Sequence, residues 1–522
     1  MMMKNSNLIG KMNRHKTLFF LILLTAILTR FLWIGNIPGN CAVNQDEAYA
    51  GYEAWSILHY GHDSWGYSMP VYLTTWGSGM SALQSYLMIP WVALFGLTSF
   101  AIRLPQAIHG VLTIIAFYFL ARKIRGGRFA LTAMAFMTVV PWHIMISRWA
   151  YDCNYLPGFL VYSVLFLVMG TENREFLPLS GLFFGLSLYT YAASWIVMPI
   201  LVLGSVLWLL CCRKISFSRY LVYFFAILGV LATPLILFVA VNMGLLAEIQ
   251  TPFISIPKMP MFRSGDYSMD VKTMMSHLYE TIMMLIHQED SRDLNSIGEI
   301  GIYYKISIIP FVIGVCAFAY DIFRKKSEAS KLECIVLLQF LCGLLLGAFL
   351  EEPLIHRVNI VHIPILYFTA LGIYAIICHY GEAAKYAAVT VYGACLFLFS
   401  LHYTVDYDAR VAAINHDGLK YALEYADSLS PKKIYVLQGI NYMYCVFYEQ
   451  IPTDEFRKTF RTSSERTSVA NFETEADYHD AEIEPGCVYI CNSEDRDVVE
   501  YMQNMGMEMH YFSYVTLGTI SE

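Results

Sequence analysis

Long apolar stretches separated by short polar segments dominate the first 400 residues of the chain. Stretches of the length that crosses a bilayer core, about 17–25 residues, lie near 17–34, 101–121, 129–146, 155–170, 177–193, 195–211, 219–241, 304–322, 333–350, 358–378 and 384–402. After residue 402 the pattern changes to short buried-strand runs at 433–437 and 487–490 and helical spacing at 417–429 and 495–505. The pattern predicts a polytopic α-helical membrane domain over 1–402, with about eleven transmembrane helices, and a small α/β domain over 403–522.

Composition and charge support this division. The 522 residues are 57% hydrophobic and 15% charged, whereas an ordinary soluble chain has about 45–50% apolar and about 25% charged residues. The net charge of −7 is uneven, because residues 403–522 hold 21 acids and 9 bases. An acidic tail thus follows a basic membrane part, and a uniform helix bundle is excluded.

The positions of basic residues predict the orientation of the helices. Three clusters should be cytoplasmic under the positive-inside rule, around 122–128, 213–219 and 324–331. Because successive spans cross the membrane in opposite directions, all three clusters fall on the cytoplasmic side only if a further apolar stretch at 79–97 does not cross. We therefore expect an interfacial or re-entrant helix there. The N-terminus is then cytoplasmic, and the outer segments are 35–100, 146–155, 242–303 and 351–357 together with the tail. A plasma-membrane location follows, and the long segment 242–303 is a candidate lid.

Carboxylates in two outer segments are the first candidates for chemistry. Asp46 and Glu47 follow the first predicted span, and Asp152 lies between the third and fourth spans. Ionisable residues at a membrane boundary that face a cavity are functional candidates. The competing interpretation is that Asp46 caps a short interfacial helix over 47–60, and the two interpretations are compatible.

Cations lie on the same predicted face as these carboxylates. Arg148 precedes Asp152 by four residues, and His356 and Arg357 lie at another outer helix end. Arg148 and Asp152 could form an ordinary helical ion pair, and Arg357 could extend to lipid headgroups. Alternatively, these side chains bind a phosphate, for which the planar guanidinium is suited. Together the carboxylates and cations outline a site for transfer from a phosphorylated lipid.

Other candidate ligands are less specific. Tyr49 and Trp76 could bind a sugar, although Trp and Tyr are also enriched at membrane interfaces. Cys487 and Cys491 lack the spacing of a zinc or CxxC site, so no structural metal is predicted. Metal dependence stays open, because adjacent carboxylates also suit a divalent cation. No nucleic-acid partner is expected.

Several short motifs together resemble a known family: Asp46-Glu47-Ala48-Tyr49, Gly61-His62-Asp63, Trp76-Gly77, Leu94-Phe95-Gly96, Arg103-Leu104-Pro105, Ser147-Arg148 with Asp152, and Tyr189-Thr190-Tyr191. Over most of 15–402 the chain resembles the bacterial branch of the protein O-mannosyltransferase and lipid A aminoarabinose transferase superfamily. These are GT-C-type glycosyltransferases of the family 39/83 kind. The resemblance matches Asp46 to the principal catalytic aspartate and Asp152 to the second acidic position. The aminoarabinose branch carries a lysine in the first loop, whereas residues 17–122 of this chain contain no lysine.

The resemblance implies an inverting transfer from a polyprenyl-phosphate sugar to an extracytoplasmic protein, glycan or lipid acceptor. Asp46 would be the general base, Glu47 and Asp152 would orient the acceptor, and Arg148, His356 and Arg357 would bind the donor phosphate. The alternative is a transporter or flippase of a lipid-linked or polar solute. Transporters usually show internal repeats and ionisable residues at the midplane, and neither pattern is found in the sequence.

Overall fold

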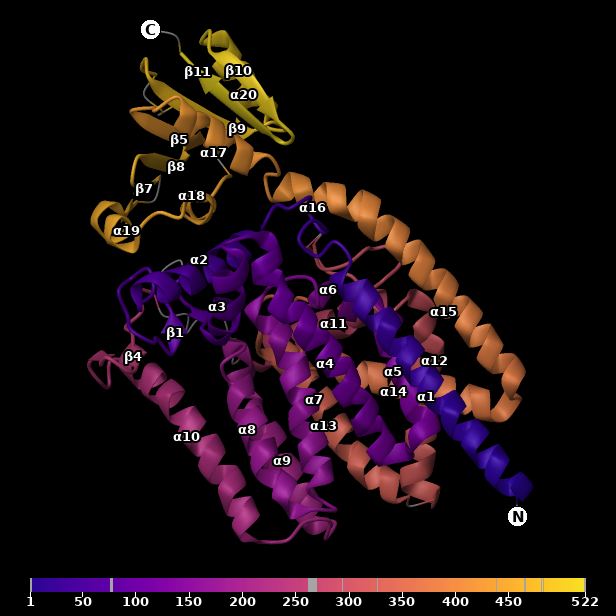
Figure 1. The fold of residues 1–522 in the computed structure, drawn as a ribbon. Helices are drawn as coiled ribbons and strands as arrows, with labels where there is room; N and C mark the ends of the chain where they lie inside the picture. The colour runs from indigo at the N-terminus through magenta and orange to yellow at the C-terminus, as the bar shows by residue number, and fades with distance from the viewer. Residues whose placement is uncertain are drawn as a thin grey trace.

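The computed structural model describes residues 2–75, 78–261, 270–292, 294–325, 327–437, 439–463, 466–479, 481 and 483–520. Most of the chain is helical, and long helices run side by side through the body of the molecule (Figure 1). Each of the eleven predicted apolar stretches coincides with a helix. These are α1 Met2–Phe31, α4 Ser99–Arg125, α5 Gly127–Val139, α7 Leu156–Met169, α8 Leu177–Ser187, α9 Met198–Cys211, α10 Arg219–Asn242, α12 Ile308–Tyr320, α13 Glu328–Phe349, α14 His362–Tyr380 and α15 Glu382–His402.

The helices differ in how far they extend without a break. Within the described residues, seven helical stretches are long and apolar enough to cross a membrane. Other apolar helices are shorter, and α5 shows why. Val140 precedes Pro141 and has extended backbone angles (φ −70°, ψ 132°), as steric contact with a following proline requires. The chain therefore leaves α5 and restarts as α6, Pro141–Ile146.

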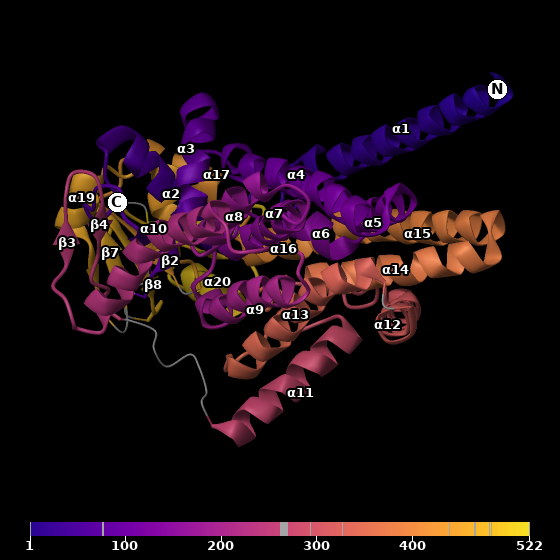
Figure 2. The same cartoon turned by 90° about the horizontal axis from the view of Figure 1, so that it is seen from below.

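The first outer segment folds onto one end of the helix bundle. It contains α2 Gln45–Tyr60, the short paired strands β1 Tyr72–Leu73 and β2 Met80–Ser81, and α3 Leu83–Phe95. With 13 residues, α3 is too short for a span of about 20 residues. Comparison of Figures 1 and 2 shows α3 lying across the direction of the long helices. This agrees with the interfacial placement expected for 79–97.

The segment between α10 and α12 contacts the first outer segment. Strands β3 Ile249–Gln250 and β4 Ser255–Ile256 pair with one another, and Ser255 exchanges backbone hydrogen bonds with Val71 (3.0 Å) and Met69 (3.3 Å). Helix α11, Val271–His287, follows and packs against α13. The predicted lid is therefore tied to its neighbour at β4, and residues 262–269 of it lie outside the described residues.

The C-terminal region contains the predicted α/β domain. The helix that starts as α15 continues past the expected boundary at 402 through a π-helical turn, Tyr403–Tyr407, into α16, Asp408–Ile414. A seven-stranded sheet follows, in the order β10-β11-β9-β5-β8-β7-β6, with β5 parallel to β8 and β9. Its elements are α17 Leu419–Ser428, β5 Lys433–Leu437, α18 Tyr442–Glu449, α19 Thr453–Thr459, β6 Arg461–Thr462, β7 Thr467–Val469, β8 Phe472–Ala476, β9 Cys487–Asn492, α20 Arg496–Asn504, β10 Glu508–Phe512 and β11 Val515–Thr519.

The sheet domain packs directly on α2 and shares a hydrophobic core with it. Gly51 permits the close approach, since a Cβ atom there would lie 2.8 Å from Ile102 Cγ2 and 3.0 Å from Phe447 Cε2. The Tyr52 hydroxyl donates to the Ile451 carbonyl. The sheet domain and the first outer segment consequently lie at the same end of the bundle (Figure 1).

Candidate active site

The start of α2 determines where the predicted acidic pair lies. Asn44 is the N-cap: its side-chain oxygen accepts a hydrogen bond from the Asp46 amide (2.9 Å), and its own amide donates to Glu47 Oε2 (3.1 Å). This reciprocal arrangement is a capping box. The capping role considered for Asp46 thus belongs to Asn44. Asp46 lies half-buried in the first turn, where a negative charge is favoured by the helix dipole.

Glu47 is fully buried and serves as an anchor. Its carboxylate accepts two hydrogen bonds from Arg103, Nε to Oε1 at 2.9 Å and Nη2 to Oε2 at 2.7 Å, and a third from the Ala150 amide at 2.9 Å. Arg103 also donates to the Pro38 and Ala42 carbonyls. Both side chains are 0% exposed. Glu47 therefore joins α2, α4 and the segment before Asp152.

Asp46 and Asp152 lie close enough to interact electrostatically. Asp152 begins a 3-10 turn, Asp152–Tyr155, and its oxygens accept hydrogen bonds from the amides of Cys153 (2.6 Å) and Ser81 (3.3 Å). The Asp46 carboxylate lies within electrostatic range of Asp152. Two carboxylates distant in sequence are thus brought together. Among the described residues, no group of three or more His, Cys, Asp or Glu side chains is placed to hold a metal ion.

Tyrosines that the sequence did not single out surround Asp46. Burial, and then the carboxylates of Asp46 and Glu47, raise the pKa of Tyr151. Burial also raises the pKa of Tyr444 on α18, with Asp46 among the charges acting on it. The sheet domain therefore contributes Tyr444 to the surroundings of Asp46. No motif in the tail could have identified it, because the contact depends on docking.

Arg148 does not lie open to a ligand. Its Nη1 donates to the carbonyls of Thr29 and Arg30 (3.1 and 3.2 Å), and its Nη2 donates to those of Leu32 and Ile37 (both 2.8 Å). The side chain thus binds the carbonyls at the C-terminal end of α1, which have no partner within the helix. This placement departs from the predicted phosphate contact. The helical ion pair with Asp152 is also not formed, because residues 147–151 are not helical.

The segment 351–361, which carries two further predicted cations, contacts the turn that begins at Asp152. Asn359 Nδ2 donates to the Cys153 carbonyl at 2.9 Å, and the charge of Arg357 acts on Cys153. Burial, with help from Arg357 and Arg292, lowers the pKa of His356 to about 3. His356 is consequently neutral at pH 7, and its imidazole lies 3.2 Å from Asn295 Oδ1. It can donate a hydrogen bond but supplies no positive charge.

Arg292 joins Arg357 as a second available cation. Arg292 Nη2 lies 3.4 Å from Glu352 Oε2, and Arg357 Nη1 lies 3.6 Å from the same oxygen. The two guanidinium groups share one half-exposed carboxylate at long range, so their donors are incompletely used. Arg292 lies in the predicted lid segment 242–303 and was not among the predicted site residues. The nearby acidic residues Glu289 and Asp290 were the available signal.

Of the two aromatic residues predicted to bind sugar, Tyr49 lies among the described residues. Tyr49 is 1% exposed and interacts with Thr75 and Glu53, so its ring faces protein. Trp76 lies outside the described residues. Beside Tyr49, burial raises the pKa of Glu53 to about 7 and raises that of Asp63 as well. These two acids form a buried, mutually interacting pair.

Comparison with known proteins was made with this geometry in hand. Residues 82–240 match a family described as dolichyl-phosphate-mannose-protein mannosyltransferase. No curated protein sequence matches the chain. ArnT from Cupriavidus metallidurans, in a structure bound to undecaprenyl phosphate, is similar in fold with a TM-score of 0.55 and 12% identity, over 96% of this chain and 97% of that chain. The oligosaccharyltransferase of Archaeoglobus fulgidus, tethered to an acceptor peptide, has a TM-score of 0.51 and 12% identity, over 92% of this chain and 69% of that chain.

The family match indicates the enzyme class, and the solved structures indicate the fold. The apo structure of the same ArnT agrees, with a TM-score of 0.55 over 98% of both chains. The predicted resemblance to the protein O-mannosyltransferase and aminoarabinose transferase superfamily is therefore confirmed, by the family match over residues 82–240 and by the fold of the whole chain.

Proposed function

We propose that the chain transfers a sugar from a polyprenyl-phosphate donor to an acceptor at the face of the membrane that carries the sheet domain. The observation that carries this proposal is the electrostatic interaction of Asp46 with Asp152 from a separate segment, with Arg357 in electrostatic range of the neighbouring Cys153. Displacement of a phosphate by an acceptor requires a base for the acceptor and cations for the leaving phosphate, and a second carboxylate can orient the acceptor. The undecaprenyl phosphate bound to the similar ArnT structure supports a polyprenyl carrier.

In this mechanism, Asp46 takes the proton from the acceptor hydroxyl or amine as the nucleophile attacks the anomeric carbon. The bond from that carbon to the phosphate oxygen breaks, and the polyprenyl phosphate leaves as an anion. A single displacement inverts the anomeric centre. General-base catalysis contributes about 10²–10⁴ in rate, and stabilisation of the leaving charge contributes about 10²–10³ per donor.

The remaining residues divide into positioning and contact roles. Asp152 orients the acceptor, and Arg357 with Arg292 stabilises the leaving phosphate. Glu47 is a positioning residue, because its carboxylate is fully occupied by Arg103 and backbone amides. His356 supplies a neutral hydrogen bond. Tyr444 on α18 lies within electrostatic range of Asp46, which supports a role for the sheet domain in holding the acceptor.

The orientation is part of the proposal. The last turn of α4 carries Arg122, Lys123 and Arg125 and lies at the end of the bundle away from α2 (Figure 1). Cytoplasmic segments carry an excess of Lys and Arg. The N-terminus of α1 lies at that opposite end (Figure 1). We therefore place the N-terminus in the cytoplasm and the sheet domain outside it.

A transfer assay in reconstituted membranes tests this function. A panel of polyprenyl-phosphate sugars is supplied with an extract of candidate acceptors, and loss of sugar from the lipid is followed. We expect wild type to consume one donor and Asp46→Asn to be at least about 10²-fold slower. Asp454→Asn, at an exposed carboxylate on α19, is the matched control and should retain wild-type turnover. Near-normal turnover by Asp46→Asn would remove the proposed base, and the product anomer decides inversion.

A further inference from the structure

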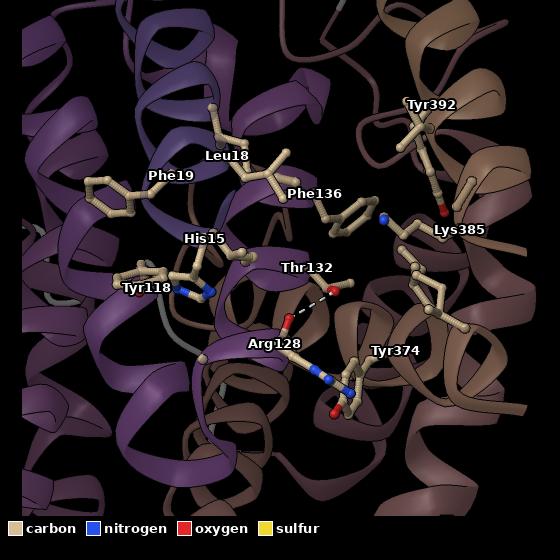
Figure 3. A pocket seen from close by; sticks show the side chains of 18 of the residues that line it. His15, Leu18, Phe19, Tyr118, Arg128, Thr132, Phe136, Tyr374, Lys385 and Tyr392 are labelled. Carbon is tan, nitrogen blue, oxygen red and sulfur yellow. Dashed lines mark hydrogen bonds between the residues drawn. The ribbon is translucent and has the colours of Figure 1, made fainter. Parts of the chain in front are cut away.

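A large groove lies at the end of the bundle opposite the candidate active site. It has a volume of about 1700 Å³ and is bounded by α1, α4, α5, α14 and α15. Figure 3 shows side chains of its walls, among them Leu18 on α1, Phe136 on α5 and Tyr392 on α15, while the ring of Phe19 lies beside Tyr118 on α4. Helices α1 and α15 each pack against α5. The upper part of this groove is therefore apolar.

Positive charge collects at one end of the groove. Its lining includes Arg14, Lys16, Arg122, Arg128 and Lys385, against the single acid Glu382. Lys385 pairs with Glu382 at 2.8 Å, and Arg14 and Arg128 lie within electrostatic range of the same carboxylate. One acid cannot neutralise five cations. The groove thus combines an apolar body with an excess of about four positive charges at its mouth.

The length of the groove matches one leaflet. Its lining on α5 runs from Arg128 to Val139, which at about 1.5 Å per residue is about 17 Å. Half of a hydrocarbon core of about 30 Å is about 15 Å. A molecule with chains of this length and an anionic head would place the head among the cations and its chains along α1, α5 and α15.

We propose that this groove is a binding site for an anionic glycerophospholipid of the leaflet at the basic face. Charge complementarity selects an anionic phosphate head, and the leaflet-length apolar walls select acyl chains over a longer polyprenyl chain. Clustered Lys and Arg beside membrane-spanning helices attract anionic headgroups. The site is separate from the proposed catalytic carboxylates, so its test does not depend on transfer activity.

Lipid binding to the full-length protein in neutral detergent tests the proposal. Phosphatidylglycerol and phosphatidylcholine with identical acyl chains are titrated, and bound lipid is counted by native mass spectrometry. We expect wild type to retain phosphatidylglycerol at least about tenfold more tightly. At roughly fivefold per cation, the triple variant Arg14→Gln/Arg128→Gln/Lys385→Gln should lose on the order of a hundredfold in affinity for phosphatidylglycerol.

Two control variants separate the groove from general surface charge. Arg174→Gln/Arg213→Gln/Arg219→Gln removes three exposed cations that do not line the groove, and it should bind as wild type does. The charge-retaining Arg14→Lys/Arg128→Lys/Lys385→Arg variant should keep most of the affinity and shows whether loss reflects charge or misfolding. Equal binding of both lipids, or equal losses in the two Gln triples, would overturn the proposal. Displacement of phosphatidylglycerol by a lower concentration of undecaprenyl phosphate would also overturn it, by identifying a polyprenyl occupant.

Discussion

The buried pair of Glu47 and Arg103 allows a quantitative test of how the site is held. Replacement of Arg103 by Met removes two charged hydrogen bonds from Glu47 and leaves its carboxylate with the amides of Ala150 and Asn44. Removal of one partner of a buried ion pair costs about 3–5 kcal/mol, because the other charge stays desolvated. We expect Arg103→Met to lower the free energy of unfolding by that amount.

A double-mutant cycle isolates the interaction between the two side chains. Glu47→Gln alone should also destabilise, since its amide group would face the donors of Arg103. The double variant Glu47→Gln/Arg103→Met lacks both charges. Its loss of unfolding free energy should therefore be smaller than the sum of the two single losses by at least about 2 kcal/mol. Equilibrium unfolding in mixed micelles of mild and denaturing detergents measures each value.

Two results would refute this reasoning. A coupling energy below about 0.5 kcal/mol would mean that the two residues act independently. Alternatively, Glu47→Gln with wild-type stability but no transfer activity would assign Glu47 to the reacting chemistry. The anchor role predicts that activity and stability fall together, because displacement of the first turn of α2 moves Asp46.

Three further perturbations test separate parts of the structure. Burial raises the pKa of Glu53 from its usual 4.5 to about 7, so the folded state holds a proton that the unfolded state releases, and Glu53 contributes a fall in stability of about 3 kcal/mol as pH rises from about 4.5 to about 7. Burial also raises the pKa values of Asp63 and Asp152, so thermal unfolding across this range should show a smaller slope in Glu53→Gln than in wild type, with the remainder due to these groups. Arg148→Met leaves four carbonyls near the end of α1 without their hydrogen-bond donor, which costs about 1–3 kcal/mol for each carbonyl that stays buried. A lower melting temperature is expected. A raised KM for the lipid-linked sugar at an unchanged melting temperature would instead favour a phosphate contact. Gly51→Val overfills the contact with Ile102 and Phe447 and should cost about 1–3 kcal/mol with faster proteolysis of the sheet domain, while Gly229→Val, where no atom lies within 4 Å of the added Cβ, should change neither.

The membrane helices and the strands of the tail could be predicted because their signals are local. An apolar run long enough to cross a membrane must be buried in lipid or protein, whatever the tertiary partners are. A short run of strand-forming residues such as Lys433–Leu437 is likewise recognised from its own sequence. The position of α3 followed from charge alternation along the whole chain. By contrast, the continuation of α15 to Ile414 was missed, because polar residues after 402 resemble a boundary when read without their packing.

The roles of the charged residues were harder to predict, because residue type and spacing do not reveal the partner. Asn44 and Glu47 have the spacing of a capping box, and this signal was overlooked beside the acidic pair. Arg148 precedes Asp152 by four residues, but the chain between them is not helical. Its four acceptors come from the end of α1 and from the residues that follow it, more than a hundred residues earlier. Such assignments depend on tertiary contacts that a single sequence does not contain.

Exposure distinguishes the structural cations at this face from those able to bind a ligand. Arg103 and Arg148 are 0% and 3% exposed, and each is surrounded by acceptors at 2.7–3.2 Å. Burial makes an unpaired guanidinium costly, so these two cannot exchange their partners for a phosphate without a large loss. Arg292 and Arg357 are 59% and 29% exposed, and their contacts with Glu352 are 3.4 and 3.6 Å. Exposed pairs of this kind contribute little stability, so replacement of Glu352 by a lipid phosphate would cost little, and this is the property that a leaving-group site requires.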